Sequence, residues 1–321
     1  MRNSYRSAVL CTALSLVSSP LVAHAQPATV EVSFDASMLE TPEGLAFDHR
    51  GNLFISLALT GEIRKIAPDG TQSTHALLPL GAPPLTPCGA FIGIMGAIAT
   101  DAHGNVFASL ASCDDAKRGV WKVTPSGQAS LIGPLPPEAL PNGIATRHGR
   151  VYVADSELGL IWRVDAGGGL PEIWFSHPAL VPPPGHVFPG PNGLQFFRGE
   201  LYVSSPAAWK VFAIEVDGDD AAGALRVHAH NACDDFDFDV HGNLYCTTDP
   251  FNTLERIAPD GQATVLLTAA DGLDGPTAAH FGRTEGDRLA LYVTNAAFPF
   301  FSTTHNPTLM RVELGVPGMP R

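Results

Sequence analysis

One pattern recurs six times along the chain, and this repetition leaves few possible folds. Each copy holds a short apolar strand, a turn with Gly, a second strand, and a third strand that often ends near Pro-Asp-Gly; examples are PEGLAFDHRGNLFIS from Pro42 and CDDFDFDVHGNLYCT from Cys233. Successive copies begin about 40 to 55 residues apart, which is the size of a four-stranded propeller blade. The sequence therefore predicts an all-β fold, a six-bladed β-propeller with four-stranded blades.

The two ends of the chain supply one blade between them. Five copies continue into a fourth strand, but the sixth is followed only by the chain end after Val316. A spare strand-like segment, Ala28 to Phe34, precedes the first copy. We expect it to pair with the strand at Thr308 to Leu314 and to close the ring, which removes an exposed sheet edge.

The first residues are typical of a cleavable export signal. Arg2 and Arg6 precede an apolar stretch from Ala8 to Val22, and Ala23-His24-Ala25 fits the small-residue cleavage pattern. We therefore expect a signal peptide at 1–25 and the propeller domain at 26–321, in a secreted or periplasmic protein. No later stretch is long and apolar enough for a membrane span.

The net charge of the chain limits the classes of molecule that it can bind. The formal net charge is −13 at pH 7, which opposes binding to nucleic acid and to anionic membranes and is compatible with cation binding. We expect a small-molecule substrate, no nucleic acid, no membrane span and a monomeric protein.

Four cysteines follow the expected cleavage site. An exported chain meets an oxidising compartment, so disulfides are expected. We favour Cys88–Cys113 and Cys233–Cys246, because each pair brackets the first strand of one copy. Four buried free thiols are the alternative.

Equivalent positions at the start of the six inner strands form a ring around the propeller axis. The residues at these positions are Glu43, Gly96, Asn142, Asn192, Asp234 and Thr277. Two carboxylates and two amides offer the oxygen donors that Ca²⁺ prefers, and the absence of His and Cys from the ring disfavours zinc and copper. The competing explanation is that the Asn-Gly pairs are ordinary turn residues.

The repeats resemble the gluconolactonase and senescence-marker-protein (regucalcin) family of six-bladed propellers, and they also resemble NHL repeats. The family resemblance implies one catalytic calcium, held by the residues that match Glu43 in PEGLAFD, Asn192 in PNGL and Asp234 in CDDFDFD. It implies that Asn142 contacts substrate or metal and that Asp234 serves as base or nucleophile. The expected activity is that of a calcium-dependent lactonase or esterase.

Several residues depart from the family pattern. Leu140 and Gly143 stand where the sugar-lactone enzymes carry Arg and Asp, and the entry loops are rich in Phe, so we expect a more apolar substrate. Asp235 replaces the usual Gly, so either Asp234 or Asp235 could be the ligand. His186, in the loop before Asn192, is a candidate second acid or base, and so is His280 on the sixth inner strand.

Two other kinds of function remain open at this point. NHL-like propellers that only bind ligands or proteins share these repeats, but they do not need the ring of Glu, Asn and Asp side chains. A lyase or synthase resembling strictosidine synthase or the streptogramin lyases would use the same scaffold.

Overall fold

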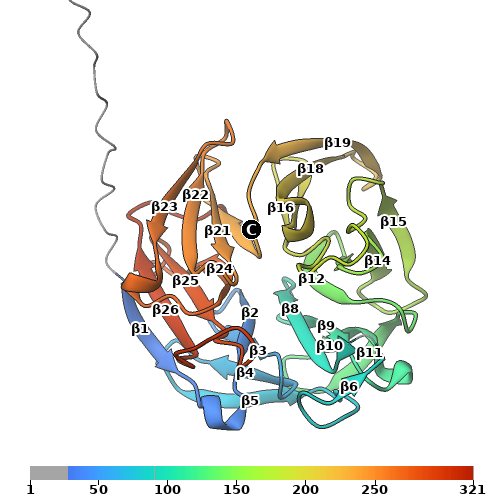
Figure 1. Cartoon of the computed structure of the whole chain (residues 1–321), viewed down its shortest axis with the longest axis horizontal. Coiled ribbons are helices and arrows are strands. Elements are labelled where there is room, and N and C mark those ends of the chain that lie inside the picture. The colour runs from blue at the N-terminus through green and yellow to red at the C-terminus, as the bar shows by residue number, and fades with distance from the viewer. Residues whose placement is uncertain (1–27, 90, 321) are drawn as a thin grey trace, which may run out of the picture.

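The computed structural model of the chain describes residues 28–89 and 91–320, so the expected signal peptide lies outside the described residues. Six four-stranded antiparallel sheets are arranged like blades around a common centre (Figure 1). The predicted six-bladed, all-β propeller with four-stranded blades is confirmed.

The blades follow one another along the chain, each beginning with its inner strand. The first contains β2 (Pro42–Phe47), β3 (Leu53–Leu57), β4 (Glu62–Ile66) and β5 (Gln72–Leu77); the second β8 (Ile94–Thr100), β9 (Val106–Ala111), β10 (Gly119–Val123) and β11 (Ala129–Pro134); the third β12 (Pro141–Arg147), β13 (Arg150–Asp155), β14 (Leu160–Asp165) and β15 (Glu172–Ser176). The fourth contains β16 (Leu194–Phe197), β17 (Glu200–Ser205), β18 (Lys210–Val216) and β19 (Ala222–Ala229); the fifth β20 (Phe236–Phe238), β21 (Leu244–Thr248), β22 (Thr253–Ile257) and β23 (Ala263–Leu267); the sixth β24 (Pro276–Phe281), β25 (Ala290–Asn295), β26 (Thr308–Glu313) and β1 (Ala28–Ser33).

Short elements connect these strands. They are the hairpin of β6 (Pro87–Cys88) with β7 (Phe91–Ile92) and the 3-10 helices η1 (Ala36–Met38), η2 (Asp115–Lys117), η3 (Pro206–Ala208) and η4 (Ala269–Asp271). No helix among the described residues is long and apolar enough to cross a membrane.

The hydrophobic core lies between the blades. One buried cluster joins Phe54 and Ile63 of the first blade to Met95 and Val106 of the second. Because each inner strand packs against its neighbours on both sides, the ring of blades is a single packed unit. Its stability depends on closure between the first and last blades.

Closure occurs as the sequence predicts. β1 is the outer strand of the last blade and pairs antiparallel with β26, from Ala28 opposite Val312 to Ser33 opposite Thr308. The ladder extends to the next residue, where the Phe34 amide donates to the Pro307 carbonyl at 2.9 Å. The N-terminal strand is therefore part of the ring.

A chain that begins at Asp35 should be less stable than a chain that begins at Ala28. Without β1, the strand β26 becomes an open edge, and Val32 and Phe34 leave the core between the last and first blades. We expect the melting temperature to fall by about 5 °C or more and the shortened chain to self-associate. Equal melting temperatures for the two chains, both monomeric, would contradict this role of β1.

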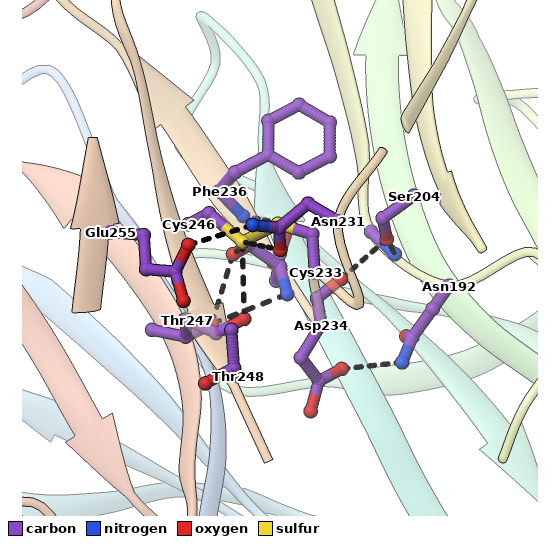
Figure 2. Close-up of a disulfide and its surroundings, with 12 residues drawn as sticks. Asn192, Ser204, Asn231, Cys233, Asp234, Phe236, Cys246, Thr247, Thr248 and Glu255 are labelled. Carbon is purple, nitrogen blue, oxygen red and sulfur yellow. Dashed lines mark hydrogen bonds between the residues drawn. A yellow bond between two sulfur atoms is a disulfide. The ribbon is translucent and has the colours of Figure 1, made fainter. Parts of the chain in front are cut away.

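Both predicted disulfides are present. Cys88–Cys113 joins the β6–β7 hairpin to the end of β9, and Cys233–Cys246 joins the residue before Asp234 to β21 (Figure 2). The second bond fixes the start of the fifth inner strand. Two disulfides are compatible with an extracellular or periplasmic protein.

Candidate metal and catalytic site

The ring residues all lie at the face where the inner strands begin, which we call the mouth. Glu43, Asn142 and Thr277 are the second residues of β2, β12 and β24, while Asn192 and Asp234 come just before β16 and β20. The second strand of each blade runs antiparallel to the first and therefore ends at the same face. Loops that follow second strands thus also border the mouth.

Hydroxyl groups on the second strands, or directly after them, hold the ring in place. In each blade a Ser or Thr hydroxyl donates to a main-chain carbonyl at the start of the next inner strand: Ser56 to Gly96, Ser109 to Asn142, Ser156 to Pro191, Ser204 to Asp234, Thr247 to Thr277 and Thr294 to Glu43. These bonds pin the backbone of each ring position to the preceding blade. The aligned copies FIS, FAS, YVS, YCT and YVT show most of these hydroxyls, so the sequence contained this signal.

The glycines that follow two ring residues allow the blades to approach closely. A Cβ added to Gly143 would lie 1.9 Å from the Asn192 carbonyl oxygen, and one added to Gly193 would lie 2.8 Å from the Asp234 carbonyl oxygen. Neither glycine has a positive φ, and Gly143 lies inside β12. The explanation of these Asn-Gly pairs as turn residues is therefore wrong.

The two ring amides bind protein groups through their nitrogens. Asn192 Nδ2 donates to Asp234 Oδ1, as Figure 2 shows, and Asn142 Nδ2 donates to Ser156 Oγ at 3.2 Å. Asn192 and Asp234 are 4% and 8% exposed. Because the Nδ2 atoms make these hydrogen bonds, the Oδ1 atoms of both amides remain available to bind a cation or a substrate.

The two ring carboxyls sit in an environment that opposes their negative charge. Burial, and then the charges of Asp249 and Asp235, raise the pKa of Glu43 to about 8. Burial, and then Glu43, Asp249 and Asp235, raise the pKa of Asp234 well above its usual range, although the Asn192 hydrogen bond acts the other way. Glu43 Oε2 is buried without a hydrogen-bond partner among the described residues. A cation would offset both penalties.

The donor set fits a hard cation that accepts amide oxygens. No three His, Cys, Asp or Glu side chains are grouped closely enough to hold a metal within residues 28–89 and 91–320. The oxygen donors that the ring offers to a cation are the two carboxylates of Glu43 and Asp234 and the amide oxygens of Asn142 and Asn192. Such an all-oxygen set suits Ca²⁺.

Of the two adjacent aspartates, Asp234 is the one that faces the ring. Asp235 Oδ1 accepts from the Phe236 amide at 2.8 Å, and its Oδ2 lies 3.9 Å from His280 Nε2. Asp235 is thus turned toward the sixth blade, whereas Asp234 binds Asn192. This arrangement favours Asp234 as the ligand.

The two candidate histidines have different surroundings. His186 Nδ1 lies 2.7 Å from the Phe188 carbonyl oxygen and its Nε2 lies 3.4 Å from Glu157 Oε2, so both ring nitrogens are used to fix the loop. His280 is 9% exposed, and its Nδ1 lies 3.7 Å from Asp237 Oδ2. The structure thus gives His186 a loop-fixing role and places His280 among aspartates of the fifth blade.

The mouth holds one further carboxyl, at a position that the repeat does not mark. Asp249 follows β21, and its Oδ1 is buried without a hydrogen-bond partner among the described residues. Burial, and then the charge of Asp274, raise the pKa of Asp249 to about 7. Asp274 Oδ2 in turn accepts from the Ser302 and Thr304 hydroxyls and the Asn306 amide, which stabilise its negative charge. Asp249 therefore gains and loses its proton near neutral pH.

Comparison with known proteins supports the fold. Neither a protein-family model nor a curated protein sequence matches the chain. Solved structures that match include a luciferin-regenerating enzyme (TM-score 0.68, 16% identity, 92% of this chain and 97% of that chain) and the calcium-binding protein regucalcin from Agrobacterium tumefaciens (0.67, 17%, 92% and 96%). A gluconolactonase from Xanthomonas campestris also matches (0.62, 17%, 92% and 99%). The resemblance expected from the sequence is thus confirmed at the level of the fold, which this chain shares with regucalcin and gluconolactonases.

Proposed function

We propose that the protein is a calcium-dependent hydrolase that cleaves a lactone or ester at the mouth of the propeller. The observation that carries this proposal is the pairing of two buried, like-charged carboxyls, Glu43 and Asp234, with two amides whose oxygens are unused. The names of the structural neighbours, a calcium-binding protein and gluconolactonases, agree with it.

Glu43, Asn142, Asn192 and Asp234 would hold the cation. When bound, Ca²⁺ supplies a Lewis acid that polarises a substrate carbonyl. A buried pair of carboxylates without a cation repels, so the ring is best stabilised when it is loaded.

The chain's own carboxyls would move the protons of the reaction. Asp234, oriented by Asn192, takes a proton from the attacking water, whose oxygen bonds to the acyl carbon as the bond to the leaving oxygen breaks. Asp249, whose pKa of about 7 keeps part of it protonated at neutral pH, would give its proton to the leaving oxygen. The water is thereby divided between the two products, an acid and an alcohol.

Export by the signal at 1–25 would bring the protein to the periplasm or the extracellular space, where its two disulfides persist. The substrate is a small molecule, and the working unit is a monomer.

The proposal is tested by assaying the purified protein on a panel of lactones and aryl esters. We expect hydrolysis that a chelator abolishes and added Ca²⁺ restores. Leu140→Ala should retain activity, because Leu140 offers no oxygen donor and is outside the ring. Absence of hydrolysis across the panel with Ca²⁺ present, or hydrolysis that survives chelation, would make a ligand-binding propeller the better account.

A further inference from the structure

Three aromatic side chains from separate segments gather at the mouth between the fourth and fifth blades. We call Phe188, Trp209 and Phe251 the rim cluster. The ring centroids lie 6.4 Å apart for Phe188 and Trp209, 5.7 Å for Phe188 and Phe251, and 5.3 Å for Trp209 and Phe251. All three pairs are thus in contact, so the rings form one continuous aromatic surface.

This surface is open to solvent. Trp209 is 51% exposed and Phe251 is 44% exposed, whereas the larger part of each side chain would normally be buried in a soluble domain. Trp209 also has a φ of 52°, a left-handed backbone conformation that is uncommon for a bulky residue. This conformation is that of a helix C-cap, in which the Trp209 amide donates to the Pro206 carbonyl and the indole is left at the surface. A contiguous aromatic surface that stays exposed is typical of a binding site.

The rim cluster adjoins the proposed catalytic carboxyls through the chain itself. Phe251 is the second residue after Asp249, whose charge acts on both Glu43 and Asp234. Phe188 lies in the loop that leads into Asn192, and Trp209 caps the C-terminus of η3, the short helix that directly follows β17. The rim cluster and the ring therefore border the same face of the propeller, where one substrate can meet both.

We propose that the rim cluster binds an aromatic group of the substrate, so that the enzyme acts on aryl or arylalkyl esters and lactones rather than on sugar lactones. This inference rests on the proposed hydrolase function. Aromatic rings stack on one another with a gain beyond that of area burial. A sugar can also pack its C–H face on such rings, but apart from the indole N–H they make no hydrogen bonds to the hydroxyl groups that distinguish a sugar lactone. Nothing in the rim cluster replaces the Arg that sugar-lactone enzymes carry at the position of Leu140.

Kinetics with matched substrates test this specificity. We expect Trp209→Ala/Phe251→Ala to lower kcat/KM for 1-naphthyl acetate about 10-fold through KM, and to leave kcat/KM for methyl acetate unchanged. Phe251→Leu, which keeps an apolar side chain, should show a smaller loss. Leu170→Ala is the matched control, because Leu170 is 89% exposed in the turn between β14 and β15, away from the rim cluster. Equal losses for both esters would overturn the proposal.

A binding measurement separates failure of the rim cluster from failure of the hydrolase. Titration calorimetry with 1-naphthaleneacetamide, which has no ester bond, needs no catalysis. We expect the wild-type protein to bind it and the double variant to bind it about 10-fold more weakly, even if neither ester is hydrolysed. Absence of binding by the wild-type protein, or equal binding by the double variant, would overturn the proposal whatever the result for catalysis.

Discussion

Asp234→Asn is expected to lower kcat/KM for a hydrolysed ester by about 10² to 10⁴-fold. The substitution keeps the size of the side chain, but it removes the proton acceptor and one of the two negative charges of the ring. The change acts on the chemical step, so kcat should fall more than KM rises. Circular dichroism of the variant should match that of the wild-type protein.

Asp235→Asn is the matched control for this prediction. Asp235 is adjacent in the chain and also an aspartate, but its carboxylate accepts from the Phe236 amide and lies near His280 rather than binding Asn192. We expect a loss of activity below about 10-fold, since only the electrostatic influence of Asp235 on the ring changes. A larger loss for Asp235→Asn than for Asp234→Asn would show that the wrong aspartate was assigned.

The second large effect is a pH dependence of stability that appears only without metal. The pKa of Glu43 is raised from 4.5 to about 8 and that of Asp249 from 3.8 to about 7 in the folded chain. At pH values between the ordinary and the raised pKa of each group, the folded protein binds more protons than the unfolded protein. The free energy of unfolding therefore falls as the pH rises. In the presence of a chelator, the free energy of unfolding should decrease by a few kcal/mol between pH 5 and pH 8.

Bound Ca²⁺ should reduce the dependence of stability on pH. A bound cation offsets the charges of Glu43 and Asp234, and its linkage to folding adds stability that grows with free Ca²⁺. Melting temperatures at pH 5, 6.5 and 8, with chelator and with Ca²⁺, measure the effect. The two curves should diverge as pH rises, and Glu43→Gln should reduce the slope in chelator. Parallel curves would contradict the assignment of these carboxyls to a cation site.

The sequence was sufficient to predict the ring because the ring is a property of the repeat. Aligning the six copies placed Glu43, Asn142, Asn192 and Asp234 at equivalent positions, and a propeller brings equivalent positions together. Closure by β1 followed from counting strands. These features depend on periodicity, which a single sequence displays.

Asp249 and the rim cluster could not be predicted in this way, because they depend on loops that are not repeated. Asp249 acquires its raised pKa only through burial and through Asp274, which comes from a different blade connection. The rim cluster joins segments around Phe188, Trp209 and Phe251 that the alignment leaves unmatched. The Phe content of the entry loops indicated an apolar mouth but not which rings meet.

Isothermal titration of Ca²⁺ into the metal-free protein at pH 7.5 tests the central claim most directly. We predict one Ca²⁺ per wild-type chain, and none for Glu43→Gln/Asp234→Asn when circular dichroism shows that this variant is folded. A wild-type protein that binds no Ca²⁺, or a double variant that binds it with unchanged Kd, would contradict the assignment of the mouth as a metal site.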